Sequence, residues 1–369
     1  MTELQLAYNL LRAALDGSVP HVGDTPPEAS RWWSLFRLLQ RNNVAALCYD
    51  AAAAAGAPRQ VLMPWLAERE KAVDRHRYQR QVQDDIVEKM RAHGIQTLVL
   101  KGTHTAQYYP KSECREFGDL DLYFYDRHAD ADKVACREFG VDLSNDSHHH
   151  TKYDYRGVTV ESHYDFVNVH YPPSNRRYEA LLKSLVDKKD QLPTTHYPLP
   201  TTHYPLPTTH YPLPTFEVLF LLRHMACHFA ASRITLRDLA DWALTCRALQ
   251  GEVDWEQVQQ TVDDYGMRPF VTILNAIAEK QLGIVLPLQR DNGPDILAHT
   301  ALVEHDLVYG TPEAVDRNAD GLARLGWKLR RWRALAWKRR LVYSDSETRL
   351  LLASLTSHAE KPHSILHKM

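Results

Sequence analysis

Apolar positions repeat at helical spacing through the first 92 residues of the chain. The first stripe consists of residues three and four apart: Leu4, Ala7, Leu10, Leu11 and Ala14. The same spacing returns at Trp32, Leu35, Phe36 and Leu39, and the run from Trp65 to Arg91 contains neither Pro nor Gly. Because such a stripe is typical of a helix packed on one side, we expect an all-helical N-terminal region over residues 1–92.

The pattern changes after His93-Gly94, a pair typical of a helix end. Short runs of strand-forming residues follow at 95–100 and 120–125, and residues 130–139 can form a helix. Two alternating runs, 151–155 and 158–164, flank Arg156-Gly157 and predict a hairpin. We therefore predict the α+β class, with a small mixed-sheet core over residues 93–190 embedded between N- and C-terminal helical regions.

A heptapeptide, Pro-Thr-Thr-His-Tyr-Pro-Leu, occurs three times in tandem over residues 193–213. Two prolines in each copy prevent a helix, and units this short cannot stack into a solenoid. We expect an extended, exposed linker over residues 191–215, with a partner-binding or metal-binding role for its histidines left open. Helical periodicity resumes at Phe216, which predicts a C-terminal helical domain over 216–320.

The last segment, residues 321–369, begins with a basic stretch. Between Leu322 and Val342 there are eight basic residues and no acidic one. An apolar stripe shares this stretch: Leu322, Leu325, Leu329, Trp332 and Ala336. One amphipathic helix docked on the protein accounts for both patterns. Contact with RNA or DNA phosphates through residues 324–340 and binding to an anionic membrane surface are the alternatives.

Composition narrows the class of protein. The 369 residues are 44% apolar and carry a formal charge of −2, which is ordinary for a globular protein. No run reaches the roughly 18–20 apolar residues of a membrane helix, and the N-terminus lacks the pattern of a secretion signal. The five cysteines form no CxxC pair. We therefore expect a cytoplasmic protein without a transmembrane segment, disulfide framework or structural zinc site.

Three carboxylates are the candidate metal ligands. Asp119 and Asp121 flank Leu120 on a predicted strand, so their side chains project from the same face. Glu161 lies on the second strand of the predicted hairpin. Hard divalent cations prefer such oxygen ligands, and a two-metal site needs carboxylates that bridge. These residues therefore predict a site for Mg²⁺, or for Mn²⁺ in its place.

A candidate phosphate loop precedes the carboxylates. Lys101-Gly102-Thr103 follows the first predicted strand and is expected to open a helix. Glycine lets the backbone approach a phosphate, and the N–H groups at a helix start favour anions. The order of strand, glycine turn, helix and carboxylate-bearing strand suits metal-assisted attack on a nucleoside triphosphate.

These motifs also resemble those of a known family. In order they are Leu100-Lys101-Gly102, Tyr108-Tyr109-Pro110, Arg115, Gly118-Asp119-Leu120-Asp121-Leu122 and Val160-Glu161-Ser162-His163. Their order and spacing resemble the uncharacterised bacterial nucleotidyltransferase family of the DNA polymerase beta-like superfamily, over roughly residues 1–290. The chain departs from the family pattern at Thr103, where Gly or Ser is usual, and at Ser162, which is often apolar.

The resemblance implies an enzyme that moves NMP from an NTP to a hydroxyl acceptor and releases pyrophosphate. It implies that Asp119, Asp121 and Glu161 are the catalytic metal ligands. Gly102 and Thr103 would contact phosphate, with Lys101 or Arg115 stabilising the charge of the leaving group. His163 would support the ligands from behind, and His228 and Asp238 would line the acceptor pocket. The acceptor, whether a small molecule, a protein or RNA, is not specified.

Two other functions remain as alternatives: a non-catalytic nucleotide- or RNA-binding protein, and a toxin-like transferase that acts on nucleic acid through the basic stretch. The other histidines suggest little chemistry at this level. His224 and His228, four residues apart, are expected to pack rather than bind zinc. The run His148-His149-His150 is expected to lie in an exposed loop, so that only His163 among the 20 histidines stays near the site.

Overall fold

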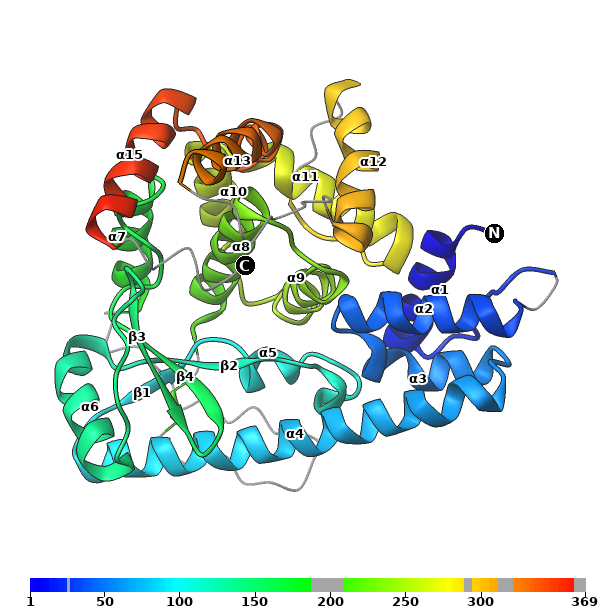
Figure 1. The fold of residues 1–369 in the computed structure, drawn as a ribbon, viewed down its shortest axis with the longest axis horizontal. Coiled ribbons are helices and arrows are strands. Elements are labelled where there is room, and N and C mark those ends of the chain that lie inside the picture. Colours follow the sequence, from blue (N-terminus) through cyan, green and yellow to red (C-terminus); the bar gives the residue numbers. More distant parts are fainter. Residues whose placement is uncertain (25–26, 187–208, 211, 289–293, 311–320, 362–369) are drawn as a thin grey trace.

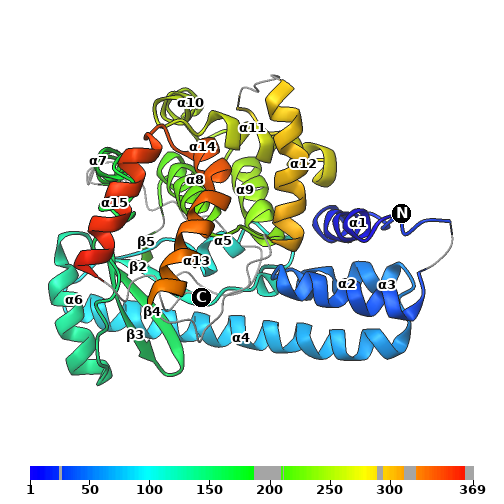
Figure 2. The same cartoon turned by 45° about the horizontal axis from the view of Figure 1, so that its top comes forward.

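Helices surround a small sheet in the computed structural model, which describes residues 1–24, 27–186, 209–210, 212–288, 294–310 and 321–361 (Figure 1). Four helices precede the sheet: α1 (Glu3–Asp16), α2 (Ala29–Arg41), α3 (Ala45–Ala54) and α4 (Arg59–Ala92). Helix α4 runs along the length of the molecule, opposite helices α8 to α14 (Figures 1 and 2). The predicted α+β class is confirmed.

Helix α4 links two apolar cores. Its first half contributes Val61, Trp65 and Val73 to a large core shared with the other N-terminal helices and with the C-terminal helices. Its second half contributes Val82 and Ile86 to the core beneath the sheet. Helix α4 therefore ties the sheet to the helical part of the molecule, together with Leu98 and Tyr123 of the sheet, which also belong to the large core.

The sheet has five strands in the order β3-β4-β2-β1-β5. Their bounds are Thr97–Val99 (β1), Asp119–Tyr123 (β2), His150–Tyr155 (β3), Val158–His163 (β4) and Thr209–His210 (β5). Strands β2 and β4 are parallel, whereas β1–β2 and β3–β4 are antiparallel. The predicted mixed sheet and the predicted hairpin around Arg156-Gly157 are both confirmed.

The two faces of the sheet differ in character. Leu120, Leu122 and Val160 lie on the face that packs against α4 and against α6 (His128–Val134), which continues as a π-turn over Ala135–Phe139. The alternate positions, Asp121 and Glu161 among them, lie on the opposite face. One face thus supplies the apolar core, and the other presents charged side chains toward α8 (Pro214–Ala231).

The remaining helices build the C-terminal part and the connections around the sheet. The short elements are α5 (Thr103–Ala106), the 3₁₀ turns η1 (Ser112–Cys114) and η2 (Tyr125–Arg127), and α7 (Asn175–Val186). They are followed by α9 (Leu236–Ala248), α10 (Trp255–Asp264), α11 (Arg268–Ile277), whose last turn widens over Ala278–Leu282, and α12 (Pro294–Tyr309). The chain closes with α13 (Gly321–Ala334), α14 (Ala336–Val342) and α15 (Glu347–Glu360).

The basic stretch is not the single helix that its pattern predicts. The chain turns at the buried Leu335, so Ala336 belongs to a second helix, and Leu329 is 50% exposed instead of lying in a buried stripe. The turn has a physical reason. It brings Lys338 and Arg339 inside, where they pair with Asp306 at 2.6 Å and with Glu347 at 2.9 Å. Part of the basic stretch is therefore docked on the protein.

Most of the heptapeptide repeat lies outside the described residues. Within them, Thr209 and His210 of the third copy form β5, which pairs in parallel with Thr97 and Leu98 of β1. Thr209 and His210 therefore form an edge strand of the sheet within the segment expected to be a linker.

Two findings concern the described part of the chain. None of its helices combines the length and the apolar character that crossing a membrane requires. All five cysteines lie in this part, and none of them forms a disulfide.

Candidate active site

Parallel pairing of β2 and β4 brings the predicted carboxylates together. Asp121 lies directly opposite Glu161 in the register, and His163 follows two residues later on the same face. The Nε2 atom of His163 lies 3.2 Å from Asp121 Oδ1 and 3.8 Å from Glu161 Oε2. All three side chains are buried. Asp119, at the start of β2, is half-buried on the same face.

Lys101 places a positive charge beside these carboxylates. Its Nζ atom lies 3.2 Å from Asp121 Oδ1 and 3.2 Å from Nε2 of His224 on α8. Burial alone would lower the pKa of Lys101, but the charges of Asp121, Asp119 and Glu161 outweigh it and raise that pKa. The ammonium group is therefore held in its charged form next to Asp121.

The same contacts keep Asp121 ionised. Burial by itself would raise the pKa of this carboxyl group. The charge of Lys101, together with the hydrogen bond and charge of His163, overcomes burial and holds the pKa of Asp121 well below its usual range. A buried, ionised carboxylate opposite a second carboxylate is a suitable donor set for a divalent cation that prefers oxygen, and the ligand atoms of Asp121, Glu161 and His163 all lie within 4.8 Å of one another.

The glycine turn is present where the sequence predicts it. Gly102 precedes α5 with a φ of +67°, a conformation that favours glycine. A Cβ atom at this position would lie 3.3 Å from Cδ2 of Phe117 and 3.7 Å from the carbonyl oxygen of Asp119. The absence of a side chain thus lets the turn pack directly against the start of β2.

Arg115 and Thr103 hold this turn from inside the protein. Arg115 donates to both carboxylate oxygens of Asp241 on α9, at 2.7 and 2.8 Å, and to the carbonyl oxygen of Gly102 at 3.0 Å. The Thr103 hydroxyl donates to the side chain of Gln83 on α4. Both side chains are buried, so each fixes the position of the loop from inside the protein.

A second acidic residue braces the same turn from α8. Glu217 accepts a hydrogen bond from the Tyr108 hydroxyl at 2.8 Å and contacts Nε2 of His104 at 2.9 Å. The neighbouring Tyr109 donates to Asp241 at 2.6 Å. The sequence analysis did not predict these two hydrogen bonds, although Tyr108 and Tyr109 are part of the motif. The reason is that Glu217 and Asp241, which accept the bonds, lie more than 100 residues later in the chain.

The two candidates for the acceptor pocket have different surroundings. His228 is exposed on α8, with its ring centre 4.4 Å from that of His224. Asp238 accepts hydrogen bonds from the backbone and hydroxyl of Thr235 at 2.7 and 2.8 Å and from Arg237 at 3.0 Å. Burial opposes ionisation of Asp238, but the charge of Arg237 and these hydrogen bonds lower its pKa to about 2. Its carboxylate thus caps the N-terminus of α9.

The histidine run 148–150 was wrongly expected to be an exposed loop. His148 and His150 are buried, and His150 opens β3 directly opposite His163. Its Nε2 atom lies 3.4 Å from Glu161 Oε1. The reason is the hairpin register: counting back from the Arg156-Gly157 turn already pairs His150 with His163. His150 and His224 therefore join His163 at the site, contrary to the expectation that only His163 lies there.

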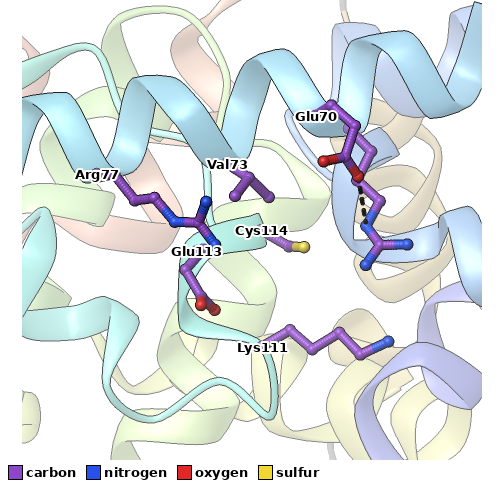
Figure 3. Close-up of a pocket in the computed structure, with 7 residues that line it drawn as sticks. Glu70, Val73, Arg77, Lys111, Glu113 and Cys114 are labelled. Carbon is purple, nitrogen blue, oxygen red and sulfur yellow. Dashed lines mark ion pairs between the residues drawn. The ribbon is translucent and has the colours of Figure 1, made fainter. Parts of the chain in front are cut away.

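A separate pocket of about 280 Å³ lies against α4 and the η1 turn (Figure 3). Charged side chains dominate its lining, which is made up of Arg69, Glu70, Val73, Arg77, Lys111, Glu113 and Cys114. None of these residues belongs to the group around Asp121. The candidate site is therefore the cluster of charged side chains on the sheet around Asp121 and Glu161, and the pocket beside α4 is not part of it.

Comparison with known proteins gives the class of this chain. A family model described as "Uncharacterised nucleotidyltransferase" matches residues 28–283, a range that holds every residue of the group around Asp121. The protein is a nucleotidyltransferase, an enzyme whose substrate is an NTP. It belongs to this uncharacterised nucleotidyltransferase family, which confirms the resemblance seen in the sequence. No curated protein and no solved structure matches the chain.

Proposed function

We propose that the enzyme transfers NMP from an NTP to a hydroxyl group with Mg²⁺, or Mn²⁺, held by Asp119, Asp121 and Glu161. The observation that carries this proposal is the register that sets Asp121 directly opposite Glu161 on a buried face. Bound there, the metal supplies charge stabilisation to the triphosphate and to the attacking oxygen.

The residues of the chain have separate tasks in this reaction. The acceptor oxygen forms a bond to the α-phosphorus while the bond to the pyrophosphate oxygen breaks, and the hydroxyl proton passes to Glu161. Lys101, 3.2 Å from Asp121, supplies positive charge to the leaving pyrophosphate. Gly102 and the backbone of Thr103 meet the phosphates, and Arg115 positions them through the Gly102 carbonyl.

The acceptor approaches from the side of α8. Lys101 contacts His224 there, and the ring of the exposed His228 lies beside that of His224, tilted by 51°. A small molecule, a protein or an RNA end can each serve as the acceptor at this surface. Asp238 contributes to it indirectly, by capping α9.

Pyrophosphate release from each NTP, measured with Mg²⁺ and with the metal chelated, tests the proposal. We expect Asp119→Asn and Asp121→Asn to lower turnover by a factor of about 100 or more. Asp264→Asn, at an exposed position on α10, is the matched control and should retain full turnover. Unchanged turnover in both site variants, or binding of NTP by the wild-type protein without pyrophosphate release, overturns it.

Nucleic acid as the acceptor is favoured by one observation. Arg330, Arg333 and Arg340 remain exposed within residues 324–340, whereas Lys338 and Arg339 are buried in ion pairs. If RNA or DNA binds here, affinity should fall with added salt. Replacing the three exposed arginines by Gln should weaken that binding, and salt-independent binding argues against it.

A further inference from the structure

Three imidazole rings lie beside the carboxylates of Asp121 and Glu161. His150 and His163 face each other across β3 and β4, and His149 adjoins them. The ring centre of His149 lies 4.4 Å from that of His150 and 5.5 Å from that of His163. The ring centres of His150 and His163 are 5.0 Å apart. One ligand atom from each of the three lies within 4.8 Å of the others.

Hydrogen bonds orient these rings. Nδ1 of His163 lies 3.2 Å from the carbonyl oxygen of Asp165. Nε2 of the same ring lies 3.2 Å from Asp121 Oδ1, and because a carbonyl oxygen and a carboxylate oxygen only accept, a metal ion that binds Nε2 replaces the proton shared with Asp121. Nδ1 of His149 and of His150 lie 3.1 and 3.3 Å from the hydroxyl oxygen of Ser147. Each ring is thus held through Nδ1, as histidines that bind a metal through Nε2 usually are.

We propose that His149, His150 and His163 form a second metal site, separate in chemistry from the carboxylate site, that takes a transition-metal ion such as Zn²⁺. Three imidazole nitrogens suit Zn²⁺ and its neighbours, whereas Mg²⁺ prefers oxygen. Zinc binds imidazole nitrogen at about 2.0–2.1 Å, so the three ligand atoms, which lie within 4.8 Å of one another, move closer together to share one ion.

Glu161 lies beside the three rings. Its Oε1 lies 3.4 Å from Nε2 of His150, and its Oε2 lies 3.8 Å from Nε2 of His163. The carboxylate therefore stands between two of the three rings, and because it serves the Mg²⁺ site and the acceptor proton, a water molecule takes the fourth position of the tetrahedral zinc site. Its negative charge, with that of the neighbouring Asp121, favours a dication on this face of the sheet.

An ion at this site has a positioning role. It ties the segment around Ser147 and His149 to the end of β4, and so fixes Glu161. The same segment contacts the C-terminal helix α15, because Nε2 of His148 lies 3.1 Å from the carbonyl oxygen of Ser357 and Lys361 bonds to Asn145. Loading of the site therefore also orders the contact between this segment and α15.

Metal binding by the full-length chain tests the proposal. After removal of bound metal, the protein is titrated with Zn²⁺ against a chromophoric chelator and with Co²⁺, whose visible absorption reports a tetrahedral site. We expect one ion per chain in the presence of excess Mg²⁺, and a loss of affinity of about 100-fold or more in a His149→Gln/His150→Gln variant. His148→Gln, whose ring faces α15, is the matched control and should keep the affinity.

Three results overturn the proposal: no Zn²⁺ or Co²⁺ binding by the wild-type protein, equal affinity in the double variant, or loss of binding in His148→Gln alone. The last result would assign the ion to His148, His170 and Glu360, whose potential ligand atoms also lie close together. If the double variant fails to fold, the single variant His149→Ala, at a half-buried position, replaces it in the test. We expect this variant to lose at least about tenfold in affinity for Zn²⁺.

This inference and the proposed transfer reaction fail separately. Zinc affinity is measured without NTP, and Asp119→Asn, which should abolish turnover, is expected to leave it unchanged. Conversely, an enzyme that releases pyrophosphate with Mg²⁺ and binds no Zn²⁺ would keep its function and lose only the second site.

Discussion

Arg115 and Asp241 form a buried two-point ion pair that joins the glycine turn to helix α9. The pair closes at 2.7 and 2.8 Å, and Arg115 reaches Gly102 with its third donor. Tyr109 shares the same carboxylate. The glycine turn therefore takes its position from the C-terminal helices as well as from the sheet that carries Asp119, Asp121 and Glu161.

Arg115→Ala should destabilise the protein by about 3–5 kcal/mol, because Asp241 is left buried without its main partner. Arg115→Lys keeps the charge but loses the two-point contact. It should therefore raise the KM for NTP while lowering the free energy of unfolding less than Arg115→Ala does. Urea unfolding and NTP saturation kinetics measure the two effects. The exposed Arg77 provides the control: Arg77→Lys should change neither, and an equal response to both Lys variants contradicts the assigned role.

Gly102→Ala should lower stability by about 1–3 kcal/mol and impair NTP binding. The new Cβ meets Phe117 at 3.3 Å in a backbone conformation that L-residues rarely adopt. Gly94 has a similar φ of +69° with no atom within 4 Å of a Cβ, so Gly94→Ala isolates the backbone strain. Thermal unfolding and NTP affinity should show the larger loss at position 102; the same loss at both positions speaks against close packing of the turn.

Lys338→Met should cost about 3–5 kcal/mol of stability because Asp306 remains buried and loses its counter-charge. Lys338 is fully buried, and its Nζ lies 2.6 Å from Asp306. Adding Asp306→Leu should restore much of the loss. Arg340→Met, at an exposed position, is expected to have almost no effect. Chemical denaturation of the four proteins decides; a mild single variant would mean that this lysine is not docked as described.

Asp238→Asn should remove about 2 kcal/mol of stability at neutral pH, the amount that corresponds to lowering the pKa from 3.8 to about 2. A carboxyl group whose pKa is depressed on folding stabilises above its ordinary pKa and loses that effect as pH falls through the folded value. The gap between wild type and variant should therefore close between pH 3.8 and about 2. Unfolding free energies across this range measure it, and a gap independent of pH contradicts the capping role.

The parts that the sequence could predict are those governed by neighbours in the chain. Alternation along one strand is enough to put Asp119 and Asp121 on one face, and the turn at Arg156-Gly157 fixes the hairpin register. That register also implies the pairing of His150 with His163, which a count of positions would have found. The predicted mixed sheet followed from the same local rules.

The parts that escaped prediction depend on contacts between distant segments. Nothing in the local sequence of Arg115 distinguishes a phosphate ligand from a partner of Asp241, which lies 126 residues later. The break at Leu335 has a similar origin. A continuous helix would keep the apolar stripe in line, but the chain turns here and forms the buried ion pair between Lys338 and Asp306. Tertiary pairing of buried charges overrode the helical pattern in that segment.

The edge strand β5 has a consequence for how the repeat tolerates changes in length. Its residues, Thr209 and His210, recur unchanged in the first two copies as Thr195-His196 and Thr202-His203. Backbone hydrogen bonding to β1 does not distinguish identical copies, so whichever copy stands next to α8 after a deletion is able to form the strand. Slippage of the gene by whole repeat units would then shorten or lengthen the tether in steps of seven residues and leave the sheet complete.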